Sequence, residues 1–248
     1  MSSVALPIRT PGSPPPRRRG RGRAVVRGVG EVFITLGVLL LLMTVYQLWW
    51  TNVESAQAIA VERDVLTQEW RNAPVVAAVP AEELVEPKPT FGQAFALLYI
   101  PRMRDKVWAL PINQGTSKDV LARGAGHYVR SAMPGEVGNF AIAAHRSTHA
   151  EPFANVDRLR VGDKVYVQTK QAWYTYTLQK DDPTLTPYDV WVVAPVPGEP
   201  GATPTKKLIT MTTCTPRYGS TGRWAWWGEL TSVQPASAGA PDGLTGTA

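Results

Sequence analysis

The run Leu208-Ile209-Thr210-Met211-Thr212-Thr213-Cys214 decides the fold class, because apolar and β-branched residues fill it. Such residues favour a half-buried strand, and the single cysteine of the 248-residue chain stands at its end. A second run of this kind, residues 140–144, ends directly before His145, and Arg223 follows Cys214 by nine residues. A thiol, an imidazole and a guanidinium that converge at strand ends are sufficient for nucleophilic acyl transfer.

Further strand-like runs lie at short intervals around these two, with turn residues between them. The eight candidate strands are residues 96–100, 107–112, 140–144, 164–169, 173–179, 190–194, 208–214 and 224–233. Many short, evenly spaced strands predict one mainly β domain, built as a closed barrel or a sandwich. Ser117 is the expected N-cap of one short helix that ends near Gly124.

The formal charge of +6 comes entirely from the N-terminal arm. Residues 1–31 contain seven arginines and one acid, Glu31, and seven minus one equals the charge of the whole chain. This Pro-, Gly- and Arg-rich arm cannot build a core and is expected to be disordered. Basic arms also bind nucleic acid, but the segment that follows favours a membrane, so we expect no nucleic-acid partner.

Residues 32–50 contain no charged side chain and predict one transmembrane helix. At ~1.5 Å per residue the run spans about 28 Å, close to the hydrocarbon core of a bilayer. The preceding arginines predict a cytoplasmic N-terminus and an extracellular catalytic domain. A cleaved signal peptide is the alternative, because Ala56-Gln57-Ala58 resembles a cleavage site, but the run exceeds the ~7–15 residues of a signal core.

Composition divides the rest of the chain. Residues 51–92 predict a spacer that is helical at first and Pro-rich later, 93–235 form the β domain, and 236–248 are expected to be a disordered tail. Three scattered histidines and one cysteine do not match zinc-ligand spacing, and we find no acidic cluster suited to calcium. We therefore expect no metal or cofactor.

A single cysteine in an exported domain is either an inert buried residue or a reactive thiol. A nearby imidazolium or guanidinium would lower its pKa and favour the thiolate that attacks. His145 stands at the end of a rigid strand, whereas His127 and His149 lie in or near turns. Each of these residues taken alone has an ordinary structural explanation.

Three segments together resemble the sortase family. Residues 210–214 resemble the T-L-x-T-C signature with Met at the second position, residues 138–146 resemble the stretch that contains the catalytic histidine, and Arg223 stands where sortases carry their arginine. The resemblance covers residues 93–233. The chain departs from the family pattern at Ala144, where Gly is usual, and Arg217 offers a second guanidinium near Cys214.

The resemblance implies an eight-stranded closed β-barrel of the sortase type with short helices, preceded by one transmembrane helix. It implies a cysteine transpeptidase in which Cys214 attacks the Thr–Gly bond of a sorting signal such as L-P-x-T-G and forms a thioacyl enzyme. His145 would act as general acid and then base, and Arg223 would stabilise the oxyanion. The implied partners are surface proteins with C-terminal sorting signals and an amine of a peptidoglycan precursor.

The subclass follows from residues 126–128 and 132–139, which resemble class E sortases of high-GC Gram-positive bacteria. Those enzymes prefer Ala at the second signal position, L-A-x-T-G. His127 and Tyr128, with the signature residues Thr212 and Thr213, are the candidate substrate-binding residues. A tight turn with a packed aromatic side chain is the alternative for His127 and Tyr128.

Two other functions stay open at this point. An L,D-transpeptidase is also exported, β-rich and has His before Cys, but it shows a Ser-His-Gly-Cys cluster, which is absent from this sequence. The other alternative is a membrane-tethered binding module with an incidental thiol, whose function would survive Cys214→Ala.

Overall fold

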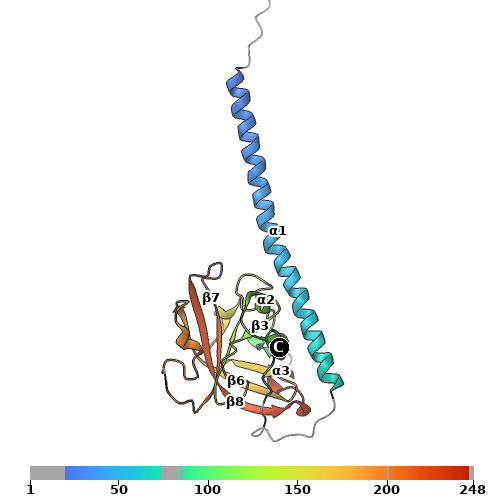
Figure 1. Ribbon diagram of the computed structural model, residues 1–248, viewed down its shortest axis with the longest axis vertical. Coiled ribbons are helices and arrows are strands. Elements are labelled where there is room, and N and C mark those ends of the chain that lie inside the picture. The colour runs from blue at the N-terminus through green and yellow to red at the C-terminus, as the bar shows by residue number, and fades with distance from the viewer. Residues whose placement is uncertain (1–19, 74–83, 85, 200, 246–248) are drawn as a thin grey trace, which may run out of the picture. The chain divides into compact units, whose positions relative to one another are not determined.

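A computed structural model describes residues 20–73, 84, 86–199 and 201–245 (Figure 1). The chain divides into two compact units, Met1–Gln47 and Leu48–Ala248. The first contains most of the predicted membrane span, and the second contains the β domain.

The helix α1, Arg21–Asn72, includes the predicted span (Figure 1). Among the described residues it is the one helix that is long and apolar enough, by length and composition, to cross a membrane. Residues 21–31 belong to this helix, so that part of the basic arm is helical and not disordered as we expected. Residues 1–19 lie outside the described part of the chain.

Eight strands close into a barrel, which confirms the expected fold class. The strands are β1 Ala94–Tyr99, β2 Leu110–Gln114, β3 Ala125–His127, β4 Gly138–Ala143, β5 Lys164–Gln168, β6 Ala172–Leu185, β7 Lys207–Thr215 and β8 Gly222–Pro235. Their order around the barrel is β1-β2-β3-β4-β7-β8-β6-β5. The pairs β2·β3 and β4·β7 are parallel, and the other neighbours are antiparallel. Closure leaves no exposed sheet edge.

Alternation along the strands separates a core face from an outer face. Ile209 and Met211 of β7 belong to the main core cluster, together with Phe140 and Ile142 of β4. Because successive side chains of a strand point to opposite faces, Thr210, Thr212 and Cys214 lie on the outer face. The Cys214 end of β7 is therefore held by a packed interior, and the cysteine lies on the outer face.

His127 is a core residue of this barrel. Its side chain is 1% exposed, and its ring stacks on Phe140 at 5.1 Å and meets Phe95 edge-on at 5.6 Å. The ring nitrogens lie 2.6 Å from Gln114 Oε1 and 2.8 Å from Ser131 Oγ. Burial lowers the pKa of His127 to about 4, so the ring is neutral at pH 7.

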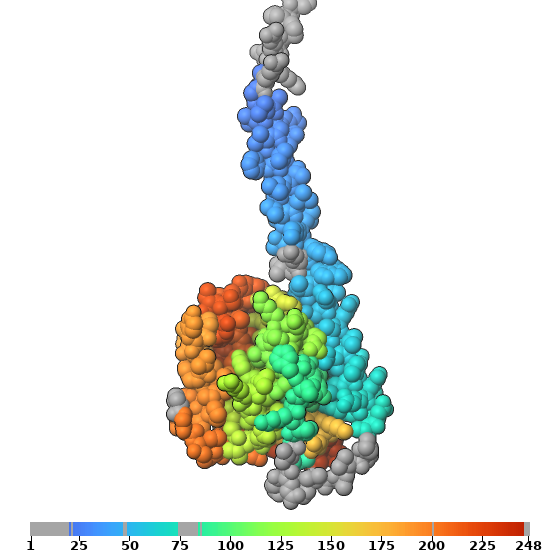
Figure 2. Space-filling view, in the orientation of Figure 1, coloured from blue at the N-terminus to red at the C-terminus, as the bar shows by residue number. Residues whose placement is uncertain are grey.

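The expected strand at 190–194 is wrong, because Val190–Val193 forms the 3₁₀ helix η3. The carbonyl of Val192 accepts hydrogen bonds from Trp227 Nε1 and Thr210 Oγ1, both at 3.2 Å. The carbonyl of Val192 is thus hydrogen-bonded by side chains and not by the backbone of a neighbouring strand. Val192 packs with Ala225 and Trp227 on β8, and the connection from β6 to β7, in orange, covers one side of the barrel (Figure 2).

The sequence did not predict the strand β3, because it has only three residues and Gly126 lies at its centre. A Cβ atom at Gly126 would lie 2.3 Å from the carbonyl oxygen of Gly115, so this close approach requires glycine. The expected short helix exists as α2, Lys118–Leu121, with Ser117 at its N-cap. The other short helices are η1 Pro101–Met103, η2 Val156–Arg158, η4 Ala236–Ala238 and α3 Asp242–Thr245. The last two fall in the tail that we expected to be disordered.

The described parts of the spacer pack on the barrel. Leu66 of α1 is 4% exposed and contacts Leu97, and Glu62 forms an ion pair with Arg123 at 2.8 Å. Glu86 is buried and accepts hydrogen bonds from Thr169 and from Tyr174 Oη, the latter at 2.8 Å. Burial raises the pKa of Glu86. These residues belong to the folded domain, and residues 74–83 and 85 of the expected connector lie outside the described part.

The loop after β4 contains three consecutive non-glycine residues in the left-handed region. The φ angles are 54° at His149, 63° at Ala150 and 53° at Glu151. This conformation costs an L-residue about 1–2 kcal/mol, and a glycine avoids the cost.

Ala150→Gly should therefore raise the free energy of unfolding by about 0.5–1 kcal/mol, since relief of strain exceeds the added entropy of the unfolded chain. Ala122→Gly is the matched control, because Ala122 has a φ of −69° and should be destabilised by a similar amount. Urea unfolding of both variants measures the difference. A stability loss of equal size at both sites would contradict the prediction.

The packing of His127 predicts a pH dependence. Its folded-state pKa of about 4 lies below the ordinary value of 6.5, so the unfolded chain binds a proton more readily. Stability is therefore fully present above about pH 6.5 and falls as the pH drops towards 4, by up to about 3 kcal/mol from this group. His127→Gln should flatten the slope of unfolding free energy between pH 7 and 4.5. An unchanged slope would show that His127 is not buried as described.

Candidate active site

The pairing of three neighbouring strands brings the three catalytic candidates to one end of the barrel. Cys214 of β7 pairs directly with Arg223 of β8. On the other side of β7, the last parallel pair joins Ala143 of β4 to Thr212, so two steps further along each chain stand His145 and Cys214. Paired residues share a face of a sheet, and adjacent strands lie about 4.8 Å apart. The outer-face residues therefore follow the order His145, Cys214, Arg223 across the strand ends.

Hydrogen bonds hold the chain just beyond β4. The amide of Ala144 donates to the carbonyl of Thr212 at 3.2 Å, and Thr213 Oγ1 donates to the carbonyl of Ala144 at 2.8 Å. The carbonyl of His145 accepts from the amide of Phe153 at 2.9 Å. His145 is thus fixed by its own backbone and by the residue before it.

The imidazole of His145 is half-buried and neutral, and one of its nitrogens is unpaired among the described residues. Its Nε2 is buried and has no hydrogen-bond partner among the residues that the structure describes. The ring stacks on His149 with centroids 4.6 Å apart. Burial, and to a smaller extent the positive charge of His149, lowers the pKa of His145 to about 4. The ring is neutral at pH 7.

Cys214 is a free, half-buried thiol. Its strand partner Arg223 donates through Nη1 to the carbonyls of Ser220 and Gly222, at 3.0 and 2.8 Å. The second guanidinium, that of Arg217, lies 3.5 Å from the carboxylate of Glu151. Arg223 therefore has the register position opposite the thiol, whereas Arg217 is engaged by an acid.

The four substrate-binding candidates divide into two groups. Tyr128 Oη lies 3.1 Å from Thr212 Oγ1, and Thr212 stands two residues before Cys214 on the same outer face. Thr213 faces inward and bonds the carbonyl of Ala144, and His127 is enclosed by the core. Tyr128 and Thr212 form a pair on the face of β7 that carries Cys214, while Thr213 and His127 have structural contacts. Their roles towards a substrate stay predictions.

Sequence reasoning missed Glu151, which joins four parts of the second unit. Its carboxylate lies 3.3 Å from Asn52 Nδ2 of α1, 3.8 Å from Lys106 Nζ and 3.5 Å from Arg217 Nη2. The one sequence signal for Glu151 was its position six residues after His145, but no local pattern identifies the residues that it contacts. Arg146 was missed in the same way.

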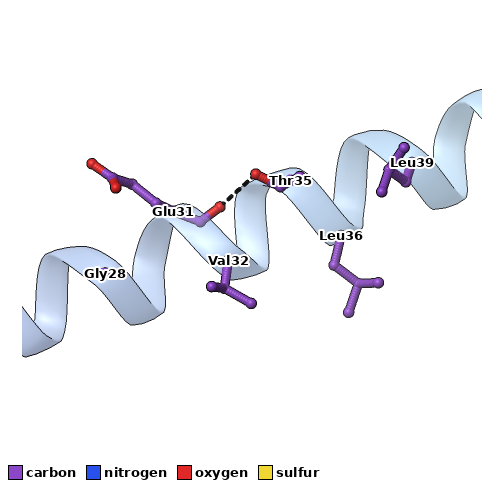
Figure 3. A pocket seen from close by; sticks show the side chains of 6 residues that line it. All are labelled: Gly28, Glu31, Val32, Thr35, Leu36 and Leu39. Carbon is purple, nitrogen blue, oxygen red and sulfur yellow. Dashed lines mark hydrogen bonds between the residues drawn. The ribbon is translucent and has the colours of Figure 1, made fainter.

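A hollow on α1 is unrelated to these residues. It lies along one face of the helix and is lined by Gly28, Glu31, Val32, Thr35, Leu36 and Leu39 (Figure 3). Thr35 Oγ1 donates to the carbonyl of Glu31 there at 2.9 Å. It contains no catalytic candidate and no second element encloses it. Within the described ranges, no group of three or more His, Cys, Asp or Glu side chains is placed to hold a metal ion.

Comparisons with known proteins identify the family of the chain. A model of the sortase domain matches residues 98–231. Sortase SrtE1 of Streptomyces coelicolor is 41% identical over 237 residues, which cover 92% of this chain, and the chain spans 64% of the length of that relative. Sortase SrtE2 of the same organism is 34% identical, with 88% of this chain and 87% of the relative covered.

Among solved structures, sortase E1 from Streptomyces coelicolor with a tripeptide in its active site superposes with a TM-score of 0.57. It is 37% identical and covers 62% of this chain and 97% of its own. The barrel, the order of His, Cys and Arg along the chain and the matched residues agree with one another: the chain belongs to the sortase family.

Proposed function

We propose that the chain is a membrane-anchored transpeptidase that cleaves a sorting signal of the L-A-x-T-G or L-P-x-T-G type between Thr and Gly. The acyl part would pass through a thioester on Cys214 to an amine of the cell wall. The observation that carries this proposal is the register of β4, β7 and β8, which aligns His145, Cys214 and Arg223 on one face. The relative with a tripeptide in its active site supports a peptide substrate.

The reaction divides into two acyl transfers. The Cys214 sulfur attacks the threonine carbonyl, and the thiol proton passes to the neutral His145. Arg223 stabilises the oxyanion, with backbone N–H groups near Cys214. The intermediate collapses, the C–N bond breaks, and His145 protonates the leaving glycine amine. An incoming amine then attacks the thioester carbonyl and gives a proton to His145; the C–S bond breaks, and that proton passes from His145 to the sulfur, which regenerates the Cys214 thiol.

The same arrangement suggests where the signal binds. Tyr128 and Thr212 form a hydroxyl pair two residues from the thiol on the outer face of the barrel. This pair offers both hydrogen-bond donors and acceptors to a peptide backbone laid along the strand end. The resemblance to class E favours Ala at the second signal position.

The N-terminal segment supports a membrane location. The apolar run within α1 is long enough to span a bilayer, and seven arginines precede it. We propose a single uncleaved span with the N-terminus in the cytoplasm and the barrel outside. Surface proteins with C-terminal sorting signals, which cross the same membrane, would be the substrates.

Incubation of the full chain in detergent with L-A-x-T-G or L-P-x-T-G peptides and triglycine should give the exchanged product. Mass spectrometry should also detect a thioester on Cys214, because the acyl group is carried by sulfur. Cys214→Ala is the control and should give neither species. The absence of adduct and product with both peptides, from a folded protein, would refute the transpeptidase proposal.

Arg223→Ala should lower kcat/KM by about 100-fold or more, since one oxyanion-stabilising donor contributes on this scale. Arg217→Ala should change kcat/KM by only a few-fold, because its guanidinium is engaged by Glu151. Steady-state kinetics of the two variants with the better peptide compares them. The reverse ranking would assign the catalytic role to Arg217.

A further inference from the structure

Arg146 is a buried cation that the proposed mechanism does not use. The residue is 8% exposed, although it directly follows His145 at the mouth of the barrel. Burial of a guanidinium costs on the order of several kcal/mol unless hydrogen-bonding or charged partners compensate it. Its contacts therefore need an explanation.

Arg146 follows His145 in the chain, and its guanidinium contacts the chain neighbours of the other two catalytic candidates. Its Nη1 lies 3.3 Å from Oγ1 of Thr215, and its Cζ lies 4.8 Å from the ring centroid of Trp224. Thr215 follows Cys214, and Trp224 follows Arg223. One planar group thus connects the ends of β4, β7 and β8.

Two further contacts fix these partners. Asp157 Oδ1 lies 3.6 Å from Nη2 of Arg146, which anchors the guanidinium to η2. Trp224 Nε1 donates to Asp181 Oδ2 at 2.9 Å, which holds the indole on β6. The Nε of Arg146 is buried without a hydrogen-bond partner among the described residues.

Arg146 acts where the backbone ladder stops. The parallel ladder ends at Ala143 and Thr212, and one further amide bond joins Ala144 to Thr212. Period-two alternation places Thr215 of β7 and Trp224 of β8 on the face opposite to the catalytic candidates, and the contacts of Arg146 with both place its guanidinium there. The guanidinium therefore joins the strand ends beyond the last backbone hydrogen bond between β4 and β7, on the face opposite to the catalytic candidates.

We propose that Arg146 is a positioning residue that sets the spacing of His145, Cys214 and Arg223 by clamping the three strand ends. This inference rests on the proposed function, because it assigns Arg146 to the same reaction. It differs from a purely structural role in a measurable way. A methionine fills similar space without the cost of a buried charge, so a purely structural role predicts that Arg146→Met is tolerated.

The test compares Arg146→Met and Arg146→Lys with the wild-type chain in detergent. Arg146→Met should keep its Tm and KM but lose about 10–100-fold in kcat, because small misplacement of reacting groups has effects of this size. The kcat of Arg146→Lys should lie between those of the wild type and Arg146→Met, since an ammonium cannot both bond Thr215 and stack on Trp224. Arg158→Met is the control, because Arg158 is 57% exposed and pairs with Asp105 at 3.7 Å.

A second measurement does not depend on the peptide. The rate of Cys214 alkylation by iodoacetamide between pH 5 and 10 should show a higher midpoint in Arg146→Met, since the guanidinium of Arg223 is no longer held opposite the sulfur. Wild-type kcat together with a wild-type alkylation midpoint in Arg146→Met overturns the inference. If that variant does not fold, Arg146→Lys decides by the same two readouts.

Failure of both variants to fold would assign Arg146 to stability alone and would overturn the inference as well. Failure of the proposed function is distinguishable. In that case the wild-type chain gives no peptide product, while the alkylation midpoints still show whether Arg146 controls the environment of Cys214.

Discussion

The parallel pairing of β4 with β7 is the constraint on which the rest of the site depends. Six consecutive pairs join Gly138–Ala143 to residues 207–212 in one unbroken register. A slip of one residue would move every side chain of β7 to the other face and would bury Cys214 while exposing Met211. Burial of Ile209 and Met211 therefore fixes the position of the thiol as firmly as it stabilises the core.

Threonine suits this constraint at two positions of β7. Its branched Cβ favours the strand. Because Thr212 and Thr213 point to opposite faces, their hydroxyls form one hydrogen bond to the neighbouring chain on each face of the sheet. Thr212 Oγ1 donates to the carbonyl of Ile142 at 3.2 Å, and Thr213 Oγ1 to that of Ala144 at 2.8 Å. The two threonines before the cysteine thus hold β7 to β4 and to the residue that follows β4, through hydrogen bonds on both faces of the sheet. Arg146 extends the same fastening beyond the last backbone bond.

The sequence predicted features that depend on local pattern and missed those that depend on distant contacts. Alternation and β-branching located β4, β5, β7 and β8, and the family resemblance supplied the closed barrel. Residues 190–194 have strong β propensity, yet Trp227 and Thr210 bond the backbone there and η3 results. β3 was missed because Gly126 lacks a strand-forming side chain. Contacts of Arg146 and Glu151 arise only after the barrel closes, so no local pattern indicated them.

In the proposed mechanism, His145 and Arg223 would have complementary electrostatic tasks. Burial lowers the pKa of His145 to about 4, so its imidazolium, when it forms, is a stronger acid than an ordinary imidazolium. Such an acid holds a proton only briefly and passes it readily to a leaving amine. It is a poor permanent counter-ion for a thiolate or an oxyanion. A guanidinium remains charged at every physiological pH, and Arg223 stands opposite the thiol. In the proposed mechanism the site would therefore separate proton transfer on His145 from charge stabilisation by Arg223, so that burial of the histidine would not remove the cation.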